Sequence, residues 1–359
     1  MVEEVAPGAT IGILGGGQLG RMLCLAAARM GYRTHVYCPE TDAPASFVTD
    51  QTTTALYDDV DALARFAQTI DVATYEFENI PRQTIETLQR GVPVHPSAHA
   101  LGVSQDRLAE KSLCRDLGLP TTTFAAIDGP EDFKAAVAET GLPAILKTRR
   151  MGYDGKGQRF VRSANDLDSA WMDLGAGPCI LEGVVDFAVE ISVLIARQPS
   201  GAVATYDIPE NTHRDGILRE SRVPARLSGA ALETARDIAH RLAAALNYVG
   251  VGAVEMFATK DGSVLVNEIA PRVHNSGHWT IDACATDQFE QHIRAICGLP
   301  LGSTARAFDV VMTNLIGHDV DAWRTYLDDP LAKLHLYGKD KVRTGRKMGH
   351  VTKLSLTGT

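Results

Sequence analysis

Long apolar runs are missing from this sequence. No stretch approaches the ~20 apolar residues that span a bilayer, and the most hydrophobic helical run, residues 22–28, lies between Arg21 and Arg29. The first residues, Met1 to Glu4, lack the basic start of a signal peptide. The six cysteines are scattered, and no two of them have the spacing of metal ligands. These absences predict a reduced, cytoplasmic protein that does not bind membranes.

Basic residues are also scarce, with 35 lysines and arginines against 44 acids and a net charge of −9. They are unevenly spread, because residues 331–359 carry a net charge of +6 and leave −15 for the rest of the chain. An acidic body predicts no nucleic-acid partner, since phosphate backbones need a broad positive surface. The basic end is either a solvated tail or a site for one anion. Its cations are Lys333, Lys339, Lys341, Arg343, Arg346, Lys347 and Lys353.

Strand and helix patterns alternate over about the first hundred residues. An apolar strand at 10–14 is followed by a glycine-rich turn, a helix, and a second strand at 34–37. This alternation predicts a parallel, doubly wound sheet. The turn fits G-x-G-x-x-G at Gly15, Gly17 and Gly20, and the start of the following helix can hold a phosphate or another anion. The alternative is that the glycines serve only the tight turn.

A second glycine-rich loop joins two strands that we predict at 144–147 and 158–162. It reads Gly152-Tyr153-Asp154-Gly155-Lys156-Gly157 and follows no Walker pattern. The two strands are expected to be antiparallel, and the loop can fold over phosphates while Lys147 lies beneath it. The alternative is an ordinary hairpin turn at the surface.

A third feature places two acids side by side. Asp261-Gly262 is a two-residue hairpin signal between apolar runs. If Lys260 pairs with Ser263, Glu255 lies directly opposite Glu268. Two carboxylates at that separation repel unless a cation compensates, and hard oxygen ligands suit Mg²⁺. The alternative is that both acids lie in water at the edge of a sheet. Together with the lysine and the glycine lid, the acid pair predicts ATP chemistry.

The segment after the second of these strands is rich in polar side chains. Arg272, His274, Asn275 and His278 lie just past the acid pair in the sequence. Such a loop is suited to bind a small anion or a reacting nucleophile. The two histidines are otherwise expected to cap a helix or to pack in the core.

Four segments together resemble the ATP-grasp superfamily and, within it, the N5-carboxyaminoimidazole ribonucleotide synthetases. These segments are Gly15 to Met22, Gly152 to Gly157, Asn267 to Thr280 and Gly345 to His350. The resemblance covers nearly the whole chain, and the last two segments are the most specific. It implies an α/β protein with the ATP-grasp fold. The implied parts are a Rossmann-like parallel α/β domain at 1–103, an ATP-grasp domain with a glycine-loop lid at 104–300, and a small C-terminal domain at 301–359.

The resemblance implies ATP-dependent carboxylation of 5-aminoimidazole ribonucleotide in de novo purine biosynthesis. ATP would phosphorylate bicarbonate, and the exocyclic amine of the ribonucleotide would capture the carboxyphosphate, or CO₂ released from it. ADP and phosphate would be the other products. The implied metal is Mg²⁺, and the implied assembly is a homodimer.

The same resemblance assigns roles to individual residues. The ATP contacts that it implies are Arg107, Lys147, Gly152, Tyr153, Asp154, Gly155, Lys156, Gly157, Gln158, Glu182, Gly183, Val184, Val185, Glu190, His213, Asn267 and Glu268, and the Mg²⁺ ligands are Glu255 and Glu268. The ribonucleotide contacts are Gln18, Leu19, Glu76, Tyr153, Asn275, Lys339, Arg346 and Lys347. The residues expected to take part in the reaction are Arg272, Lys147, Asn275 and Lys156, with Arg272 stabilising the carboxyphosphate. Glu78 and Lys341 are alternatives to Glu76 and Lys339.

Other functions predict different site features. A formate-dependent glycinamide ribonucleotide transformylase shares the fold and much of the ATP site, but its loop is expected to carry Asp and Thr in place of Asn275 and Ser276. An NAD-dependent oxidoreductase would use the first hundred residues and leave the acid pair and the second glycine loop without a role. A nucleotide-binding protein without activity would lack Lys147 or the acids.

Overall fold

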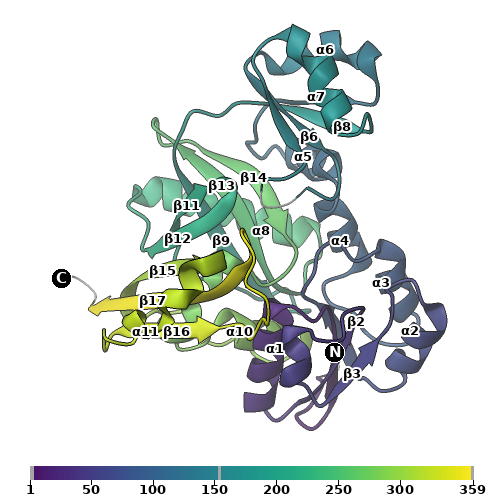
Figure 1. Ribbon diagram of the computed structural model, residues 1–359, viewed down its shortest axis with the longest axis vertical. Helices are drawn as coiled ribbons and strands as arrows, with labels where there is room; N and C mark the ends of the chain where they lie inside the picture. Colours follow the sequence, from purple (N-terminus) through teal and green to yellow (C-terminus); the bar gives the residue numbers. More distant parts are fainter. Residues whose placement is uncertain (1–3, 153–154, 357–359) are drawn as a thin grey trace.

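The computed structural model describes residues 4–152 and 155–356. Its N-terminal unit is a parallel sheet in the order β3-β2-β1-β4, as the strand and helix alternation predicts. The elements are β1 (Thr10–Leu14), α1 (Gln18–Arg29), β2 (Arg33–Cys38), β3 (Gln51–Thr54), α2 (Val60–Ala67), β4 (Val72–Tyr75) and α3 (Arg82–Leu88). Figure 1 shows this unit in purple to blue, near the N-terminus. The apolar pattern at 92–95 also predicts a short strand, but the structure has an isolated bridge there, between Ala73 and Val94.

Helices bury both faces of this sheet. Ile13 of β1 packs in a cluster with Leu23 of α1, and Leu14 packs in a second cluster with Phe66 of α2. Parallel strands that are covered on both sides appear in sequence as continuous apolar runs. This is why β1 begins and ends at the residues that the sequence predicts.

The sequence pattern at 104–117 predicts one helix, and the structure has this helix from residue 107 to 116, with a separate helix before it. α4 (Ala98–Ser104) ends before Asp106, and α5 (Arg107–Asp116) begins directly after it. The Asp106 carboxylate accepts hydrogen bonds from the backbone N–H groups of Leu108 and Ala109, at 3.1 and 3.3 Å. An aspartate that caps a helix in this way stabilises a new start, and it interrupts an apolar pattern that continues across it.

The lid is an antiparallel sheet in the order β5-β8-β6-β7. Its elements are β5 (Phe124–Ile127), α6 (Phe133–Thr140), β6 (Ala144–Thr148), β7 (Gln158–Val161), α7 (Leu167–Asp173) and β8 (Cys179–Gly183). It extends from the rest of the molecule at the top of Figure 1. The antiparallel pairing of β6 with β7 confirms the arrangement predicted for the strands on either side of the second glycine loop.

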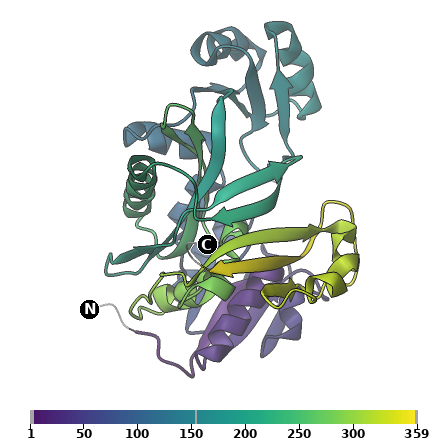
Figure 2. The same ribbon diagram turned by 90° about the vertical axis from the view of Figure 1, so that its left-hand side faces the viewer.

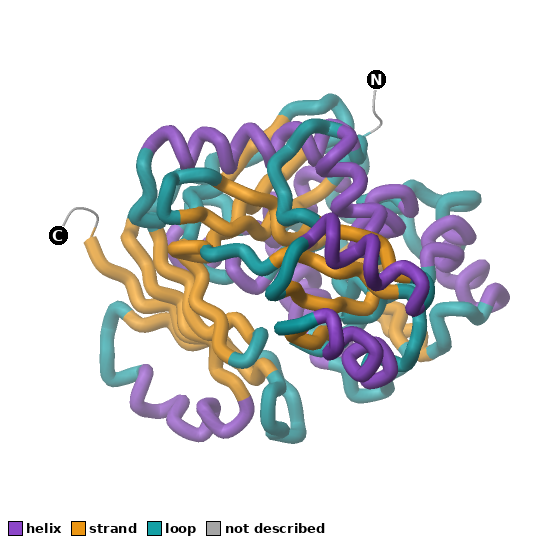
Figure 3. The backbone as a smooth tube through the Cα atoms, turned by 90° about the horizontal axis from the view of Figure 1, so that it is seen from above, coloured by secondary structure: helices purple, strands orange, loops and turns teal. Residues whose placement is uncertain are grey.

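A large sheet occupies the centre of the molecule, in the order β14-β13-β9-β11-β12-β15-β17-β16, with β10 paired to β9. Its strands are β9 (Phe187–Arg197), β10 (Val203–Thr205), β11 (Glu210–Arg214), β12 (Ile217–Val223), β13 (Gly250–Thr259), β14 (Val264–Ala270), β15 (Phe308–Ile316), β16 (Ala332–Leu336) and β17 (Lys347–Leu356). Because β15 pairs with β12, the C-terminal strands extend the sheet that the preceding part of the chain forms. Figure 3 shows this sheet from above as a twisted set of strands.

One helix, α10 (Gln288–Ile296), packs between the large sheet and α1 of the N-terminal unit. The other helices of this part are α8 (Gly229–Ala245), α9 (Thr280–Ala283) and α11 (Trp323–Tyr326). Phe289 of α10 packs in one cluster with Leu23 of α1 and with Tyr337, which follows β16. Figure 2 shows the yellow C-terminal strands beside the purple α1. In the described part of the chain, no helix has the length and apolar character needed to cross a bilayer.

Candidate active site

The predicted pairing of the two acids is confirmed, but the predicted two-residue turn is wrong. Glu255 of β13 lies opposite Glu268 of β14. At the turn, the N–H of Thr259 donates to the carbonyl of Ser263 at 2.9 Å, so that three residues form the loop. The last of them, Gly262, has a φ of +86°, which is typical of loops of this length.

A β-bulge in β14 restores the register between the turn and the acids. Met256 pairs with Val266, whereas Glu255 pairs with Glu268, and this leaves Asn267 as the extra residue. The longer turn and the bulge each shift the register by one residue, in opposite directions. The acids therefore face each other because these two shifts cancel, and not because the turn has two residues.

Each acid has a partner of its own. His274 Nε2 lies 2.8 Å from Glu255 Oε1, and Arg107 Nη1 lies 3.0 Å from Glu268 Oε2. Burial raises the pKa of Glu255, but His274 and other nearby cations outweigh it and lower the pKa to about 2. Glu255 is therefore ionised at neutral pH and able to bind a cation.

Lys147 and Glu182 form a buried ion pair in the lid. Lys147 Nζ lies 2.7 Å from Glu182 Oε2, and both side chains are buried. Burial raises the pKa of Glu182, but the charges of Lys111 and Lys147 outweigh it, so the pKa lies below its usual value. Glu182 Oε1 is buried without a hydrogen-bond partner among the described residues. The pair thus retains an acceptor for a ligand.

The described residues at the two ends of the lid's glycine-rich loop contact α5 and the strand that carries Lys147. Gln158, where the loop ends, pairs with Lys147, and Arg107 Nη2 donates to the carbonyl of Gly152 at 3.4 Å. The predicted contacts Gly152, Gly155, Lys156 and Gly157 are described, whereas Tyr153 and Asp154 lie outside the described residues.

Most of the other predicted ATP contacts lie on β8 or just after it, and on β9 and β11. Glu190 of β9 forms an ion pair with His213 Nδ1 of β11. Burial lowers the pKa of His213, but the hydrogen bond to Glu190 and the nearby acids raise it above its usual value. Gly183 ends β8, and Val184 follows it with an exposed side chain. Val185, the next residue, is partly exposed.

The first glycine-rich loop binds a carboxylate of the chain itself. Glu76 accepts hydrogen bonds from the backbone N–H groups of Gly17 at 2.8 Å and Gly20 at 3.3 Å. A Cβ atom at Gly15 or Gly17 would lie 2.7 or 2.8 Å from the Glu76 side chain, so the glycines make room for this acid. Because Glu76 uses N–H groups that a pyrophosphate would need, the structure argues against the dinucleotide interpretation.

Gln18 and Leu19 begin α1 directly after this loop. Gln18 is partly exposed, whereas Leu19 buries its side chain in the core. Only the backbone of Leu19 is therefore available to a ligand.

Glu78, the alternative to Glu76, pairs with Arg272. Arg272 Nε donates to Glu78 Oε2, and its Nη1 donates to the carbonyl of Val273 at 3.1 Å. Burial raises the pKa of Glu78, but the Arg272 guanidinium outweighs it, so the pKa lies below its usual value. Arg272 lines the same pocket as Arg107 and Glu268, which places it beside the acid pair.

Asn275 is buried, and neither Oδ1 nor Nδ2 of its amide has a hydrogen-bond partner among the described residues. The next residue is held firmly, because Ser276 Oγ lies 2.8 Å from His274 Nδ1 and 2.7 Å from Ser192 Oγ. A buried amide costs free energy unless a ligand or water binds it. Within this loop, Asn275 is the clearest indication of a ligand contact.

The basic C-terminal segment faces the first glycine-rich loop and the acids. Burial raises the pKa of Glu76, while the hydrogen bonds from Gly17 and Gly20 and the charges of Arg272 and Lys339 act in the opposite direction. The charge of Lys347 likewise helps to lower the pKa values of Glu78 and Glu255. These interactions favour the anion-site interpretation of the basic end over a solvated tail.

The same segment is held together by backbone contacts. Lys339 Nζ donates to the carbonyl of Lys347 at 2.7 Å, and Arg346 Nη1 donates to the carbonyl of Lys341 at 2.8 Å. Lys353, by contrast, pairs with Asp329 at the surface. Lys339 and Arg346, which precede β17, therefore contact backbone carbonyls, whereas Lys353, within β17, pairs with an acid.

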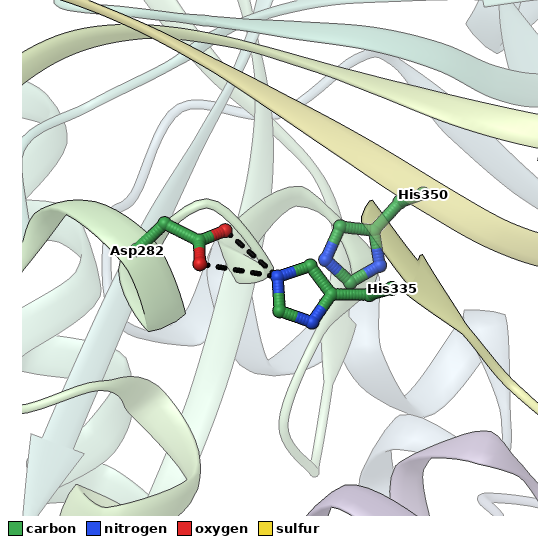
Figure 4. A group of neighbouring side chains, drawn as sticks. All are labelled: Asp282, His335 and His350. Carbon is green, nitrogen blue, oxygen red and sulfur yellow. Dashed lines mark hydrogen bonds and ion pairs between the residues drawn. The ribbon is translucent and has the colours of Figure 1, made fainter. Parts of the chain in front are cut away.

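Two histidines and an aspartate form a cluster (Figure 4). Asp282, His335 and His350 each place one oxygen or nitrogen within 4.8 Å of the others. His335 Nε2 lies 2.9 Å from Asp282 Oδ2, and the rings of His335 and His350 stack at 4.5 Å with an angle of 15°. Nitrogen lone pairs lie in the ring planes, so two nearly parallel rings do not direct them at one ion. The cluster joins β16 and β17 to α9.

The pocket beside the acids also contains residues that the sequence did not single out. Glu110 of α5 lines it together with Arg107, and the adjacent Lys111 is 1% exposed. The sequence contained a signal for them, because Glu110 and Lys111 follow Arg107 by three and four residues, and residues with this spacing share one face of a helix. Charged residues on the buried face of a helix indicate a polar partner.

Three protein families match consecutive parts of the chain. Residues 8–105 match the ribonucleotide synthetase preATP-grasp domain, residues 112–289 match the ATP-grasp domain, and residues 310–358 match the phosphoribosylaminoimidazole carboxylase C-terminal domain. The fold and the site thus define an ATP-grasp enzyme, an ADP-forming ligase.

Individual relatives narrow this class. The N5-carboxyaminoimidazole ribonucleotide synthase of Brucella melitensis is 50% identical over 98% of both chains. The solved ADP complex of an N5-carboxyaminoimidazole ribonucleotide synthetase is 45% identical, with a TM-score of 0.95 over 99% of this chain and 94% of that chain. The Aspergillus clavatus enzyme, solved with ADP and 5-aminoimidazole ribonucleotide, is 32% identical, with a TM-score of 0.90 over 98% and 94%. The chain belongs to the N5-carboxyaminoimidazole ribonucleotide synthase family.

Proposed function

We propose that this chain carboxylates 5-aminoimidazole ribonucleotide with ATP and bicarbonate, in purine biosynthesis. ATP phosphorylates bicarbonate and gives ADP and carboxyphosphate. The exocyclic amine of the ribonucleotide then takes the carboxyl group, directly or as CO₂, and phosphate leaves. The product is N5-carboxyaminoimidazole ribonucleotide.

The observation that carries this proposal is the arrangement of polar groups around the acid pair. Glu255 and Glu268 lie opposite each other, and Arg272 lines the same pocket as Glu268. The buried amide of Asn275 offers two unused hydrogen-bonding atoms close by in the sequence. A site that joins a phosphoryl donor to a small anion needs ligands for a metal, a guanidinium and polar groups for the acceptor.

Glu255 and Glu268 fit a Mg²⁺ ion. They are oxygen donors on adjacent strands, and Mg²⁺ is usually bound by one or two carboxylates together with substrate phosphates. When bound, the ion neutralises phosphate charge and orients the nucleotide. Asn267, between the two paired regions of β14, lies beside this site.

The lid and the large sheet together bind ATP. Lys147 and the backbone of residues 152–157 hold the phosphates, with Lys156 supplying a further charge. The rest of the nucleotide is held by Arg107, Gln158, Glu182, Gly183, Val184, Val185, Glu190 and His213. A lid that closes over the phosphates excludes water from carboxyphosphate, which hydrolyses readily.

The ribonucleotide lies between the first glycine-rich loop and the C-terminal segment. Gln18, Leu19 and Glu76 bind it from one side, with Tyr153 and Asn275 completing the contacts. Lys339, Arg346 and Lys347 bind its 5′-phosphate from the other side. Arg272 stabilises the negative charge of carboxyphosphate.

The broader assignments follow from the family. The domains are residues 1–103, 104–300 and 301–359, although the strands of the third extend the sheet of the second. The cellular location is the cytoplasm, and the assembly is a homodimer.

Measurement of ADP release from the purified chain tests this function. We expect full release only when Mg²⁺, bicarbonate and 5-aminoimidazole ribonucleotide are all present, with N5-carboxyaminoimidazole ribonucleotide as the product. Equal turnover with formate and glycinamide ribonucleotide would show that the chain is a transformylase instead.

A further inference from the structure

If β14 had no bulge, the side chain of Glu268 would be buried. Val264 and Val266 belong to the core cluster under α8, and residues two apart on a strand share a face. Glu268 would therefore point into that core. Ile269 belongs to the cluster instead, so the alternation changes at the bulge residue, Asn267. Glu268 faces the pocket because the strand is bulged.

Lys111 binds the bulge directly. Its Nζ donates to the carbonyls of Val266 and Asn267 at 3.0 and 2.7 Å, and to Thr121 Oγ1 at 3.0 Å. Successive carbonyls of a regular strand point in opposite directions, so one ammonium group reaches two of them only where the strand is irregular. All three N–H bonds of the ammonium group are used.

Burial makes this lysine costly. The side chain is 1% exposed, and the transfer of an ammonium ion out of water costs several kcal/mol. An apolar side chain would fill the same space without that cost, but it would leave the carbonyls of Val266 and Asn267 without this donor. Besides the charge that it places near Glu182, the lysine therefore contributes the geometry of the strand.

The same face of α5 contacts β14 on the far side of the bulge as well. Glu110 accepts a hydrogen bond from the backbone N–H of Ile269, and Arg107 Nη1 lies 3.0 Å from Glu268 Oε2. Arg107, Glu110 and Lys111 have the spacing i, i+3 and i+4, which places them on one helix face. α5 thus holds β14 at the bulge and at the two residues that follow it.

We propose that Lys111 is a positioning residue of the acid pair. By holding the bulge at Asn267, it keeps Glu268 turned towards Glu255. Without the ammonium group, β14 relaxes towards regular pairing and Glu268 leaves its place opposite Glu255. The proposal rests on the proposed function for the identity of the cation between the acids.

Metal binding to the full chain tests this role without turnover. Mn²⁺ replaces Mg²⁺ as the probe, and its binding in the presence of ADP is measured by electron paramagnetic resonance. We expect Lys111→Met to raise the Mn²⁺ dissociation constant about tenfold or more, as the loss of an orienting residue does at other metal sites. The Mg²⁺ concentration for half-maximal ADP release should rise with it.

His292→Asn is the matched control, because His292 is fully buried but does not line the pocket. It should lower stability and leave the Mn²⁺ dissociation constant unchanged. A folded Lys111→Met protein with the Mn²⁺ affinity of the wild type would overturn the proposal.

Thr121→Val decides the question if Lys111→Met does not fold. The Thr121 hydroxyl accepts from Lys111 and donates to the carbonyl of Val266 at 2.8 Å, and valine has nearly the same shape. A rise of about threefold or more in the Mn²⁺ dissociation constant supports the proposal, and an unchanged constant refutes it. Failure of the proposed function is seen separately, as a wild-type chain that binds Mn²⁺ with ADP but does not turn over.

Discussion

Two glutamates that are two residues apart have different partners in this protein. Glu76 is bound by backbone N–H groups of the first glycine-rich loop, whereas Glu78 is bound by Arg272. Both acids lie in the same short segment after β4, so local sequence does not distinguish them. Arg272 lies just after the end of β14, and its guanidinium pairs with Glu78. At the residue scale, the site is therefore defined by pairs of side chains from distant segments.

Glu268→Gln should remove most of the activity while the protein stays folded. The amide cannot carry the charge that a Mg²⁺ ligand needs, and a metal contributes several kcal/mol to phosphoryl transfer, so we expect kcat to fall about 100-fold or more. Steady-state kinetics at several Mg²⁺ concentrations, with circular dichroism for the fold, measure this. Glu86→Gln is the control, since Glu86 pairs with Arg82 at the surface. Retained Mg²⁺-dependent activity in Glu268→Gln would show that the metal assignment is wrong.

Arg346→Ala should weaken binding of the ribonucleotide far more than binding of ATP. A charge-assisted hydrogen bond to phosphate contributes about 1.5–3 kcal/mol, so the KM for the ribonucleotide is expected to rise about tenfold or more. Lys353→Ala is the control, because Lys353 lies farther along the basic segment, in β17, and pairs with Asp329. It should leave both KM values unchanged. Equal increases in the two KM values of Arg346→Ala would contradict a phosphate role.

At the scale of elements, the predictable strands are those with a continuous apolar run. β1 is observed at the predicted residues, 10–14. β11 was not predicted, because Glu210–Arg214 is polar throughout and is a strand through its pairing with β9 and β12. The pattern at 203–208 predicts a longer strand than β10, which ends at Thr205, where its pairing with β9 ends. Strand pairing depends on neighbours that the local pattern does not contain.

Gly12→Ala tests the close packing of β1 against the helix that follows β3. A Cβ atom at Gly12 would lie 2.5 Å from Ile70 Cδ1 and 2.8 Å from Phe66 Cζ. Overpacking of this kind costs about 1–3 kcal/mol, so the free energy of unfolding should fall by that amount in urea titrations. Gly229→Ala, at the first residue of α8, meets no atom within 4 Å and should leave stability unchanged or slightly raised. Equal stability of Gly12→Ala and the wild type would mean that the core adjusts to the extra methyl group.

At the scale of the whole molecule, His292 of α10 joins the N-terminal unit to the large sheet. Its Nε2 lies 2.8 Å from Thr74 Oγ1 of β4, and its Nδ1 accepts a hydrogen bond from the backbone N–H of Val251 of β13 at 3.0 Å. Nδ1 must therefore be unprotonated. Burial, with a smaller contribution from the charge of His95, lowers the pKa of His292 to about 3. The junction between the two units thus depends on a neutral histidine.

Acid should weaken this junction. The unfolded chain, in which the pKa of a histidine is about 6.5, binds a proton that the folded chain excludes. The contribution of His292 to stability is complete above about pH 6.5 and falls as the pH drops towards 3, by about 1.4 kcal/mol per pH unit. Urea unfolding between about pH 7 and 5 measures this slope, and His292→Asn should have a shallower slope by about one proton. Identical slopes in the two proteins would contradict the assignment.

Much of the candidate site can be derived from the sequence because its signals are local. The glycine-rich loops, the strand that carries Lys147 and the polar loop after β14 each depend on residues that are close in the chain. The opposition of Glu255 to Glu268 was also predicted, although the three-residue turn and the bulge at Asn267 produce it together.

Contacts between distant segments required the folded chain. The binding of Glu76 to the first glycine-rich loop, the hold of Lys111 on β14 and the approach of the C-terminal cations to the acids all join parts of the chain that are far apart in sequence. Local patterns report how a segment folds and which of its faces is buried. They contain no information about which other segment lies against that face, because that depends on how all the elements pack together.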